Sequence, residues 1–430
     1  MDCSHFSPET HMLGYGYNPE LSEGAVKCPV FQTSTFVFRS AEEGKTFFEM
    51  AYGKPGHEGE KMGLIYSRIN NPDMEILEER LKLWDGGEAA AAFSSGMSAI
   101  ATTLLTFLGP GDVLLYSNPV YGGTYKFILH ILTHFGIKVI GFRAGQNMKE
   151  VEKILKESGH AKKLKMIFIE TPANPNNDLI DIEMCSAIAS KYSSKDVKVL
   201  VSVDNTYMGP LWQHPLKHGA DIVLYSATKY IGGHSDVIAG AAVANKELVG
   251  KIKKTRTFFG TMIDPHSSWL LMRSLETLKL RMEAAATNAV KIAAYLAKHP
   301  KVEKVYYLGY TAENNPEQQR VFKKQYLSNG AMLSFDIRGG EKESFTFLNN
   351  LKHIKLAVSL GGTESLAEHP ATMTHVDIPD DEKELYHISP KMIRLSIGVE
   401  NVNDLIWDIE QALSSVPLHF AKSNVELISQ

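Results

Sequence analysis

The sequence predicts an α/β fold with a mostly parallel central sheet, an extended N-terminal segment and a smaller α+β domain near the C-terminus. The chain has 430 residues, more than one ordinary core holds. From about residue 72, helix-like segments alternate with short apolar runs, the pattern of parallel βαβ units. After about residue 265 a long helical stretch replaces this alternation. We therefore expect an N-terminal arm over 1–70, an α/β domain over 71–265 and an α+β domain over 266–430.

The arm has little hydrophobic periodicity, and its stretch AYGKPGHEGEKMG is rich in turn-forming residues, so we expect it to be exposed. The first clear helix should begin at Asn71-Pro72, because proline suits the first helical turn. Apolar side chains recur at helical spacing through the following DMEILEERLKLW. The pair Gly86-Gly87 should end this helix.

Five short apolar runs, rich in Val, Ile, Leu or Phe, predict the strands of the central sheet. They cover residues 113–116, 139–142, 166–170, 199–204 and 222–225. Because these runs are apolar throughout, both faces of the sheet should be covered by helices.

The C-terminal region should pair long helices with a second sheet. A helical pattern runs from Ser267 through RMEAAATNAVKIAAYLAKHP and should stop at Pro300. The later runs AMLSFDIRGG and KMIRLSIGVE alternate in a strand-like manner. They predict an antiparallel or mixed sheet covered by helices.

The composition excludes several classes of function. With 44% hydrophobic residues, 22% charged residues and a formal charge of -4, the chain offers no basic field for nucleic acid. It shows neither a secretory leader nor an apolar run of about 20 residues that could span a membrane. Cys3, Cys28 and Cys185 lack CxxC spacing, and none of the 16 histidines lies in an HExxH motif. We expect a cytoplasmic protein without a disulfide framework or a metal site.

Chemically active side chains follow three of the predicted strands. Glu170, Asp204 and the group Ser226, Thr228 and Lys229 stand where apolar runs stop. In an open α/β sheet, ligands bind outside the carboxyl ends of the strands. An acid, hydroxyls and an amine should therefore meet in one crevice.

The stretch FSSGMSAI (93–100) predicts an anion site at a helix N-terminus, although a plain serine cap would also explain it. Ser226 and Thr228 add weight, since their hydroxyls could bind a phosphate that also accepts bonds from the N–H groups of Gly96 and Met97. A dianionic phosphate monoester is the ligand that this set of donors favours.

Lys229 could be a solvated loop lysine, or a counter-ion for the phosphate. No GxxxxGK[ST] motif supports a nucleotide loop, and a lysine that bonds to an aldehyde cofactor explains more of the pattern. Pyridoxal phosphate combines an aldehyde, a phosphate and a pyridine nitrogen that needs an acidic partner. Asp204 suits the last role, although it could also simply cap the turn that follows it.

Several motifs together resemble the Cys/Met metabolism family of pyridoxal-phosphate enzymes. They are IYSRINNP, FSSGMSAI, VYGGTY, ETPANPN, VSVDNTY, LYSATKYIGGHSDVIAGA and SLGGTESLAEHPATMTH, and the likeness runs from about residue 20 to 415. The family includes cystathionine β- and γ-lyases, cystathionine γ-synthases, methionine γ-lyases and O-acylhomoserine sulfhydrylases. The resemblance implies the aminotransferase-like architecture called fold type I.

The resemblance also implies residue roles. Lys229 would bond to the cofactor aldehyde and Asp204 would pair with its ring nitrogen, as the residues themselves suggest. Phosphate binding is the role implied for Gly96, Met97, Ser226 and Thr228. Tyr121 would stack on the cofactor ring and transfer a proton, and Asn174 would contact the cofactor's phenolic oxygen and the substrate. The substrate α-carboxylate would be bound by Ser359, Thr374 and Arg394.

Tyr66 and Arg68 resemble a pair that family members insert into the phosphate site of a neighbouring subunit. The resemblance therefore implies a homodimer as the minimal active unit, commonly doubled to a homotetramer.

The resemblance implies a carbon–sulfur lyase of transsulfuration, acting on cystathionine first and on methionine or cysteine next. The alternative is γ-replacement by a cystathionine γ-synthase or an O-acylhomoserine sulfhydrylase. Gly123 stands where methionine γ-lyases typically carry a cysteine, and Val358 stands where many cystathionine γ-lyases carry a glutamate. The two positions favour different subgroups. They therefore leave open both the substrate and the choice between β- and γ-elimination. A catalytically silent binding protein is the alternative outside enzymes, but every cofactor position is filled.

Overall fold

The computed structural model describes residues 6–57, 59–60, 62–311 and 315–417, and its larger sheet has seven strands. The strand order is β1-β7-β6-β5-β4-β2-β3. The bounds are β1 Ala89–Phe93, β2 Val113–Asn118, β3 Lys138–Arg143, β4 Leu164–Glu170, β5 Leu200–Asp204, β6 Ile222–Ser226 and β7 Gly240–Ala244. All neighbours run parallel except β7, which is antiparallel to both β1 and β6. The expected mostly parallel sheet is confirmed.

Five of these strands are the predicted ones, whereas β1 and β7 were not predicted. Their sequences, AAAAF and GAAVA, contain mostly small residues and lack the branched side chains that indicate a strand. A Cβ on Gly240 would lie 2.1 Å from the carbonyl oxygen of Ser95, so the close approach of neighbouring backbone requires a small residue there.

Helices cover both faces of this sheet, as expected. Their bounds are α3 Pro72–Asp85, α4 Gly96–Phe107, α5 Gly122–Lys126, α6 Met148–Glu157, α7 Ile182–Tyr192, α8 Gly209–Trp212, α9 Lys246–Phe259 and α10 Pro265–Leu275. On one face, Leu104 of α4 and Ile252 of α9 share a buried cluster with Phe168 of β4. On the other face, Leu155 of α6 shares a cluster with Ile167 of β4.

Helix α3 begins and ends where the sequence predicts. The side chain of Asn71 accepts a hydrogen bond of 3.0 Å from the backbone N–H of Asp73, and Pro72 occupies the first helical position. Gly86 ends the helix with φ of 67°, a left-handed conformation that glycine adopts without strain.

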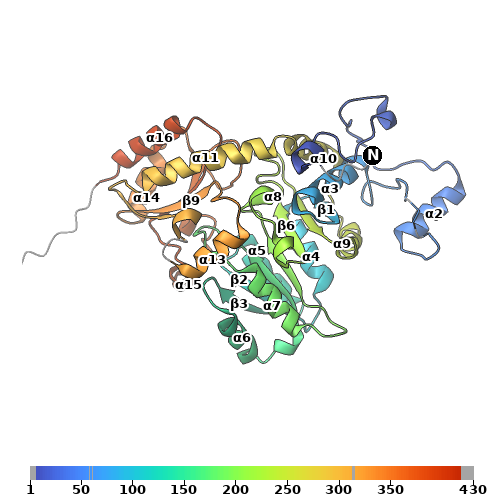
Figure 1. Ribbon diagram of the computed structural model, residues 1–430, viewed down its shortest axis with the longest axis horizontal. Helices are drawn as coiled ribbons and strands as arrows, with labels where there is room; N and C mark the ends of the chain where they lie inside the picture. Colours follow the sequence, from blue (N-terminus) through green and yellow to red (C-terminus); the bar gives the residue numbers. More distant parts are fainter. Residues whose placement is uncertain (1–5, 58, 61, 312–314, 418–430) are drawn as a thin grey trace, which may run out of the picture.

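The second sheet has five strands in the order β10-β11-β12-β9-β8. Its strands are β8 Val302–Tyr306, β9 Met332–Ile337, β10 Lys355–Leu356, β11 Leu366–Glu368 and β12 Met392–Ser396, and the accompanying helices include α11 Leu278–Leu296, α13 Pro316–Gln325, α14 Glu341–Asn350, α15 Asp380–Leu385 and α16 Val402–Ser414. Only β10 and β11 run parallel, so the predicted antiparallel or mixed sheet is confirmed. Helices α11, α14 and α16 lie along one side of it (Figure 1).

The predicted long helix is two helices in the structure. Helix α10 ends at Leu275 and α11 begins at Leu278, with the intervening Thr277 at φ -113° and ψ 8°, outside the helical range. Helix α10 packs on α3 beside the larger sheet, while α11 crosses to the smaller one (Figure 1). The break thus lets one chain segment serve both sheets.

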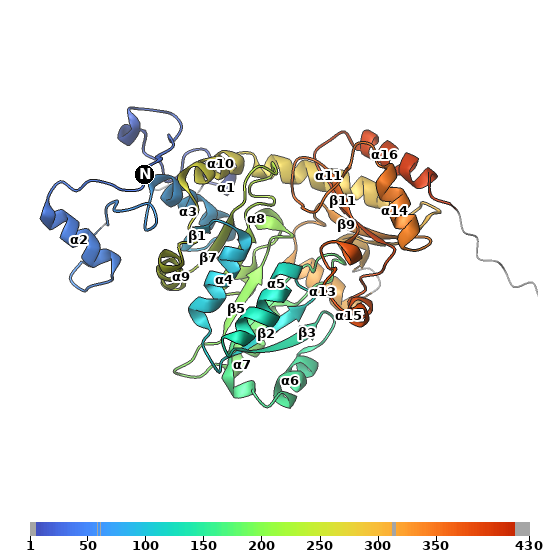
Figure 2. The same ribbon diagram turned by 180° about the vertical axis from the view of Figure 1, so that it is seen from behind.

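The N-terminal segment extends away from the two sheets. Helix α2 (Ala41–Ala51) projects from the body of the protein in both views (Figure 1, Figure 2). Phe48 and Tyr52 stack with their ring centroids 6.4 Å apart, and both are exposed. No helix of the described ranges is long and apolar enough to cross a membrane.

Candidate active site

A cavity of about 320 Å³ lies at the carboxyl ends of β4, β5 and β6, beside the first residues of α4. Its lining residues are Ser95, Gly96, Met97, Ile100, Tyr121, Glu170, Asn174, Asp204, Thr206, Tyr207, Ser226, Thr228, Lys229, Ile238 and Leu360. The predicted crevice is therefore present, and it gathers the predicted lysine, acid and hydroxyl residues.

The start of α4 packs directly on the end of β6. Ser95 caps the helix by accepting a 3.0 Å hydrogen bond from the backbone N–H of Ser98. A Cβ on Gly96 would lie 2.7 Å from Cβ of Ser226, so only glycine allows the helix end to come this close. This contact places the positive end of α4 and the Ser226 side chain on one wall of the cavity.

The turn after β6 is held by side-chain hydrogen bonds. The backbone N–H of Ser226 donates to Oγ1 of Thr206 at 2.8 Å, and Oγ1 of Thr228 accepts from the backbone N–H of Ala239 at 2.9 Å. These bonds fix the direction in which Lys229 leaves the strand.

The Lys229 side chain is half-buried and lines the cavity. Its Nζ donates to Oγ of Ser359 at 2.9 Å. Burial, together with the Arg394 guanidinium, lowers the pKa of Lys229 to about 8, while the Glu368 carboxylate acts in the opposite direction. A substantial neutral fraction near pH 7 to 8 makes this amine available as a nucleophile and a base.

Two buried carboxylates lie side by side at the ends of β4 and β5, where Glu170 and Asp204 are register partners. Burial, with a contribution from the Asp204 charge, raises the pKa of Glu170 above its ordinary value, and burial also raises the pKa of Asp204. Glu170 accepts hydrogen bonds from the backbone N–H groups of Tyr121 at 2.7 Å and Asn174 at 3.4 Å. Glu170 therefore positions the backbone of two predicted site residues.

Arg394 lies at the centre of a second polar group, on β12. Its Nη1 donates to Oδ1 of Asn174 at 3.0 Å and contacts Oε1 of Glu368 at 2.7 Å. Its Nη2 donates to the carbonyl oxygen of Ser359 at 2.7 Å. The predicted carboxylate-binding arginine is thus joined to the residue that contacts Lys229.

Thr374 belongs to the same group. Its Oγ1 lies 2.9 Å from both Oε1 of Glu368 and Nδ1 of His375. The other ring nitrogen of His375, Nε2, donates to the carbonyl oxygen of Asn174 at 3.1 Å. Burial lowers the pKa of His375 to about 4, so this ring is neutral near pH 7.

Tyr66 and Arg68 lie outside the cavity of their own chain. Nη1 of Arg68 donates to the carbonyl oxygen of Thr257 at 2.8 Å, and its guanidinium carbon lies 5.7 Å from the centre of the Tyr66 ring. Tyr121, in contrast, lines the cavity with 45% of its surface exposed. The single chain therefore brings together every predicted cofactor residue except the Tyr66 and Arg68 pair.

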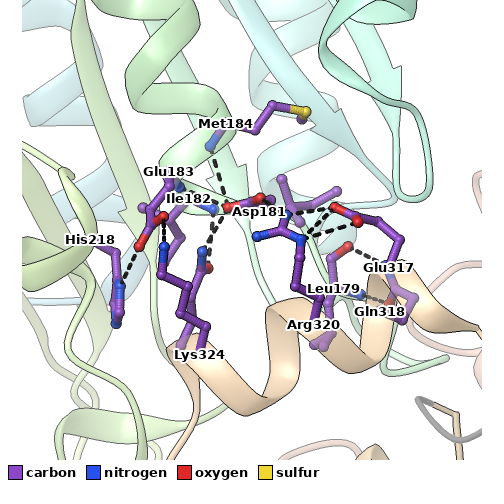
Figure 3. Close-up of polar contacts among 12 residues, drawn as sticks. Leu179, Asp181, Ile182, Glu183, Met184, His218, Glu317, Gln318, Arg320 and Lys324 are labelled. Atoms are coloured by element: carbon purple, nitrogen blue, oxygen red, sulfur yellow. Dashed lines mark hydrogen bonds and ion pairs between the residues drawn. The ribbon is translucent and has the colours of Figure 1, made fainter.

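The loop that carries Asn174 is held by contacts with α13, shown in Figure 3. The side chain of Gln318 accepts a 2.8 Å bond from the backbone N–H of Leu179 and donates a 2.8 Å bond to its carbonyl oxygen. Asp181 caps α7 and also pairs with Arg320, and Glu183 pairs with Lys324. These contacts with α13 hold the C-terminal end of the loop on which Asn174 lies.

Some cavity and network residues were not predicted as site residues. They are Thr206, Tyr207, Ile238, Leu360, Glu368 and His375. Glu368 and His375 stand within the quoted SLGGTESLAEHPATMTH motif, so the motif could have identified them as candidates. Cys28 and Cys185 are free and buried, whereas Cys3 lies outside the described residues. The described residues contain no group of three or more His, Cys, Asp or Glu able to hold a metal ion.

The residues around the cavity fit pyridoxal phosphate. The end of α4, Ser226 and Thr228 surround a space suited to a dianionic phosphate. Lys229 offers a half-buried amine with a lowered pKa, which suits a bond to an aldehyde. Asp204, on the strand beside it, suits the ring nitrogen.

The family model for Cys/Met metabolism PLP-dependent enzymes matches residues 9–414. The chain belongs to this family. It is 42% identical over 395 residues to the L-methionine gamma-lyase of Fusobacterium nucleatum subsp. polymorphum, covering 91% of this chain and 94% of that protein. It is 40% identical to the cystathionine gamma-lyase of Bacillus subtilis, covering 95% and 99%.

A solved cystathionine gamma synthase from Xanthomonas oryzae pv. oryzae shares the fold of this member of the Cys/Met metabolism family. The TM-score is 0.84 at 33% identity, over 95% of this chain and 98% of that one. The predicted fold type and the cofactor are therefore confirmed, and the family member is a pyridoxal-phosphate-dependent carbon–sulfur lyase.

Proposed function

We propose that this lyase eliminates a thiol from Cγ of an L-amino acid, with methionine-sized thioethers as its preferred substrates and cystathionine as a second substrate. The observation that carries the proposal is the half-buried Lys229 amine, with its pKa lowered to about 8, in a cavity that Tyr121 also lines. The relatives named above as gamma-lyases support elimination at Cγ.

Each residue has a chemical task in this proposal. When bound, pyridoxal phosphate supplies an electron sink that accepts the electron pair left on the substrate α-carbon. Asp204 holds the ring nitrogen in its charged form, and Arg394 binds the α-carboxylate. Lys229 removes the proton from Cα, and Tyr121 transfers a proton at the leaving sulfur.

Elimination at Cγ needs one proton transfer more than elimination at Cβ. After the Cα proton has left, a second proton must leave Cβ before the thiol can depart from Cγ. Lys229 is suited to both transfers, because an amine with a pKa of about 8 can both accept and return a proton near neutral pH. The organic product is then a 2-oxo acid that keeps the γ-carbon, which is 2-oxobutyrate for methionine and for cystathionine.

The cavity lining supports an apolar thioether. Among the lining residues only Glu170, Asp204 and Lys229 have carboxyl or amino side chains. Glu170 is engaged by the backbone N–H groups of Tyr121 and Asn174, and Asp204 and Lys229 have tasks at the cofactor. Ile238 is 69% exposed and lies on the wall, and Val358, beside the Ser359 contact, is 57% exposed. A distal charged amino-acid group would meet no partner among these residues, whereas a methylthio group would contact apolar surface.

Gly123 favours cystathionine as the second substrate. A Cβ at this position would lie 2.7 Å from Cε1 of Tyr121 and 3.4 Å from Sδ of Met97. A cysteine at this position, as in the methionine γ-lyases that the sequence resembles, would crowd the Tyr121 ring. The glycine leaves space for a longer thioether beside Tyr121.

We also propose that two chains build each site, in a homodimer that pairs into a homotetramer in the cytoplasm. Tyr66 and Arg68 lie outside their own cavity, and the arm over residues 1–70 carries exposed aromatic side chains on α2. The domains over 71–265 and 266–430 would then supply the rest of the site within each chain.

Product analysis with methionine, cystathionine and cysteine tests the reaction. Formation of 2-oxobutyrate from methionine, with kcat/KM above that for cystathionine, is the expected result. Pyruvate from cystathionine would mean elimination at Cβ and would contradict the proposal. A new thioether formed from O-succinylhomoserine and a thiol, without any 2-oxo acid from methionine or cystathionine, would instead support γ-replacement.

A further inference from the structure

The substrate-facing Arg394 is paired with a buried carboxylate. Glu368 and Arg394 are register partners across β11 and β12, and Oε1 of Glu368 lies 2.7 Å from Nη1 of Arg394. The two side chains are 0% and 3% exposed. Because the strand register itself sets this pair, the pair is a fixed part of the site.

The contacts of Arg394 leave one edge of its guanidinium free. A guanidinium has five N–H donors. Nη1 is engaged by Glu368 and Asn174, and Nη2 donates to the carbonyl oxygen of Ser359. Nε is buried and has no partner among the described residues. A buried donor without an acceptor indicates a missing ligand atom, and the edge with Nε and Nη2 suits a bidentate carboxylate.

The negative charge of Glu368 repels a second carboxylate that binds to the Arg394 guanidinium. An arriving α-carboxylate would become the second carboxylate on one guanidinium, in a site where little water screens the repulsion. The same pair acts on the reaction centre, because Arg394 lowers the pKa of Lys229 and Glu368 raises it. Removing only the charge of Glu368 should therefore strengthen carboxylate binding.

We propose that Glu368 is a positioning residue that holds Arg394 by Nη1, presents its Nε and Nη2 edge to the substrate α-carboxylate, and weakens carboxylate binding through its own charge. This inference rests on the proposed function, which gives Arg394 the role of binding the carboxylate. The α-carboxylate is bound in the ground state and in the transition state alike, so the Glu368 charge raises KM and leaves kcat unchanged.

Calorimetric titration of the holoenzyme with L-norleucine and with pentylamine tests the proposal. Norleucine has no sulfur leaving group, and pentylamine is the same ligand without its carboxylate. Glu368→Gln keeps the acceptor for Nη1 but removes the charge, so it should bind norleucine on the order of tenfold more tightly than the parent protein. Its affinity for pentylamine should change little. Glu368→Ala also removes the acceptor and should bind norleucine more weakly than Glu368→Gln does.

Steady-state kinetics with methionine add a second readout. Glu368→Gln should lower KM without raising kcat, because it changes binding of ground state and transition state alike. Glu78→Gln is the matched control, since Glu78 and Arg256 form another buried pair, with Oε1 and Nη1 2.6 Å apart, that lies outside the cavity lining. This control should lose stability without changing the preference for norleucine over pentylamine.

Three outcomes separate the ideas. Norleucine binding in folded Glu368→Gln that is no tighter than in the parent protein would overturn the role of Glu368. If the parent protein still releases 2-oxobutyrate from methionine in that case, the proposed function survives. A parent protein that binds norleucine no better than pentylamine would overturn both the role of Arg394 and that of Glu368.

Discussion

At the scale of single residues, burial determines the chemistry of the site. Lys229, Glu170 and His375 each have a pKa shifted toward the neutral form, and burial is the largest cause in all three cases. The sequence could predict Lys229 and Asp204, because a lysine and an acid at strand ends already suggest the cofactor. It could not predict that Glu368 binds Arg394, because that contact depends on the pairing of β11 with β12.

The buried His375 should make the protein sensitive to acid. Its pKa falls from 6.5 to about 4 on folding, so its contribution to stability is complete above pH 6.5 and is lost as the pH falls through 4. The full shift corresponds to about 3 kcal/mol. Urea unfolding at pH 7.5 and pH 4.5 should show a larger loss of unfolding free energy for the parent protein than for His375→Gln. An equal loss in the two proteins would contradict a buried neutral imidazole.

At the scale of elements, α13 positions the loop that carries Asn174. The sequence predicts neither α13 nor its contacts, because Gln318 and Gln325 look like ordinary polar helix residues. In the structure both are buried, and Gln325 accepts from the backbone N–H of Ile182 at 3.2 Å. The side-chain amides of these two glutamines thus hydrogen-bond to backbone groups of Leu179 and Ile182, which lie outside the strands.

Gln318→Ala should loosen this loop. It would leave the buried N–H and C=O groups of Leu179 without partners, and such losses cost about 1 to 3 kcal/mol. We expect a lower unfolding free energy in urea and a raised KM for methionine. Gln319→Ala, on the same helix but outside this contact, is the control. If both variants behave alike, the Gln318 contact does not support the loop.

At the scale of the whole molecule, most of the architecture follows from the sequence pattern. The alternation of helices and apolar runs predicts the parallel sheet, because parallel strands need crossover helices. The sequence does not predict the alanine-rich strands β1 and β7, because alanine and glycine have low strand propensity. In the structure these small residues allow the neighbouring backbone to pack closely. The proposed position of Tyr66 and Arg68 in the site of a neighbouring subunit rests on the resemblance, because in the single chain both residues lie outside the cavity.

Mixing two inactive variants should test whether two chains build each site. In Lys229→Ala each chain lacks the base, and in Arg68→Ala each chain lacks the arm residue. A mixed dimer would contain one site with Lys229 from one chain and Arg68 from the other, so about a quarter of the parent activity should return after joint refolding. If no activity returns although mixed dimers form, Lys229 and Arg68 act within one chain.

The proposed reaction depends most on Lys229 as the base that removes the substrate Cα proton. Exchange of this proton can be followed by NMR for L-norleucine in D2O, with the holoenzyme and with Lys229→Ala loaded with the cofactor. The parent protein should exchange the proton rapidly, and the variant should be slower by about 100-fold or more, the usual contribution of a positioned base. Equal exchange rates in the two proteins, with norleucine bound to both, would show that Lys229 is not this base.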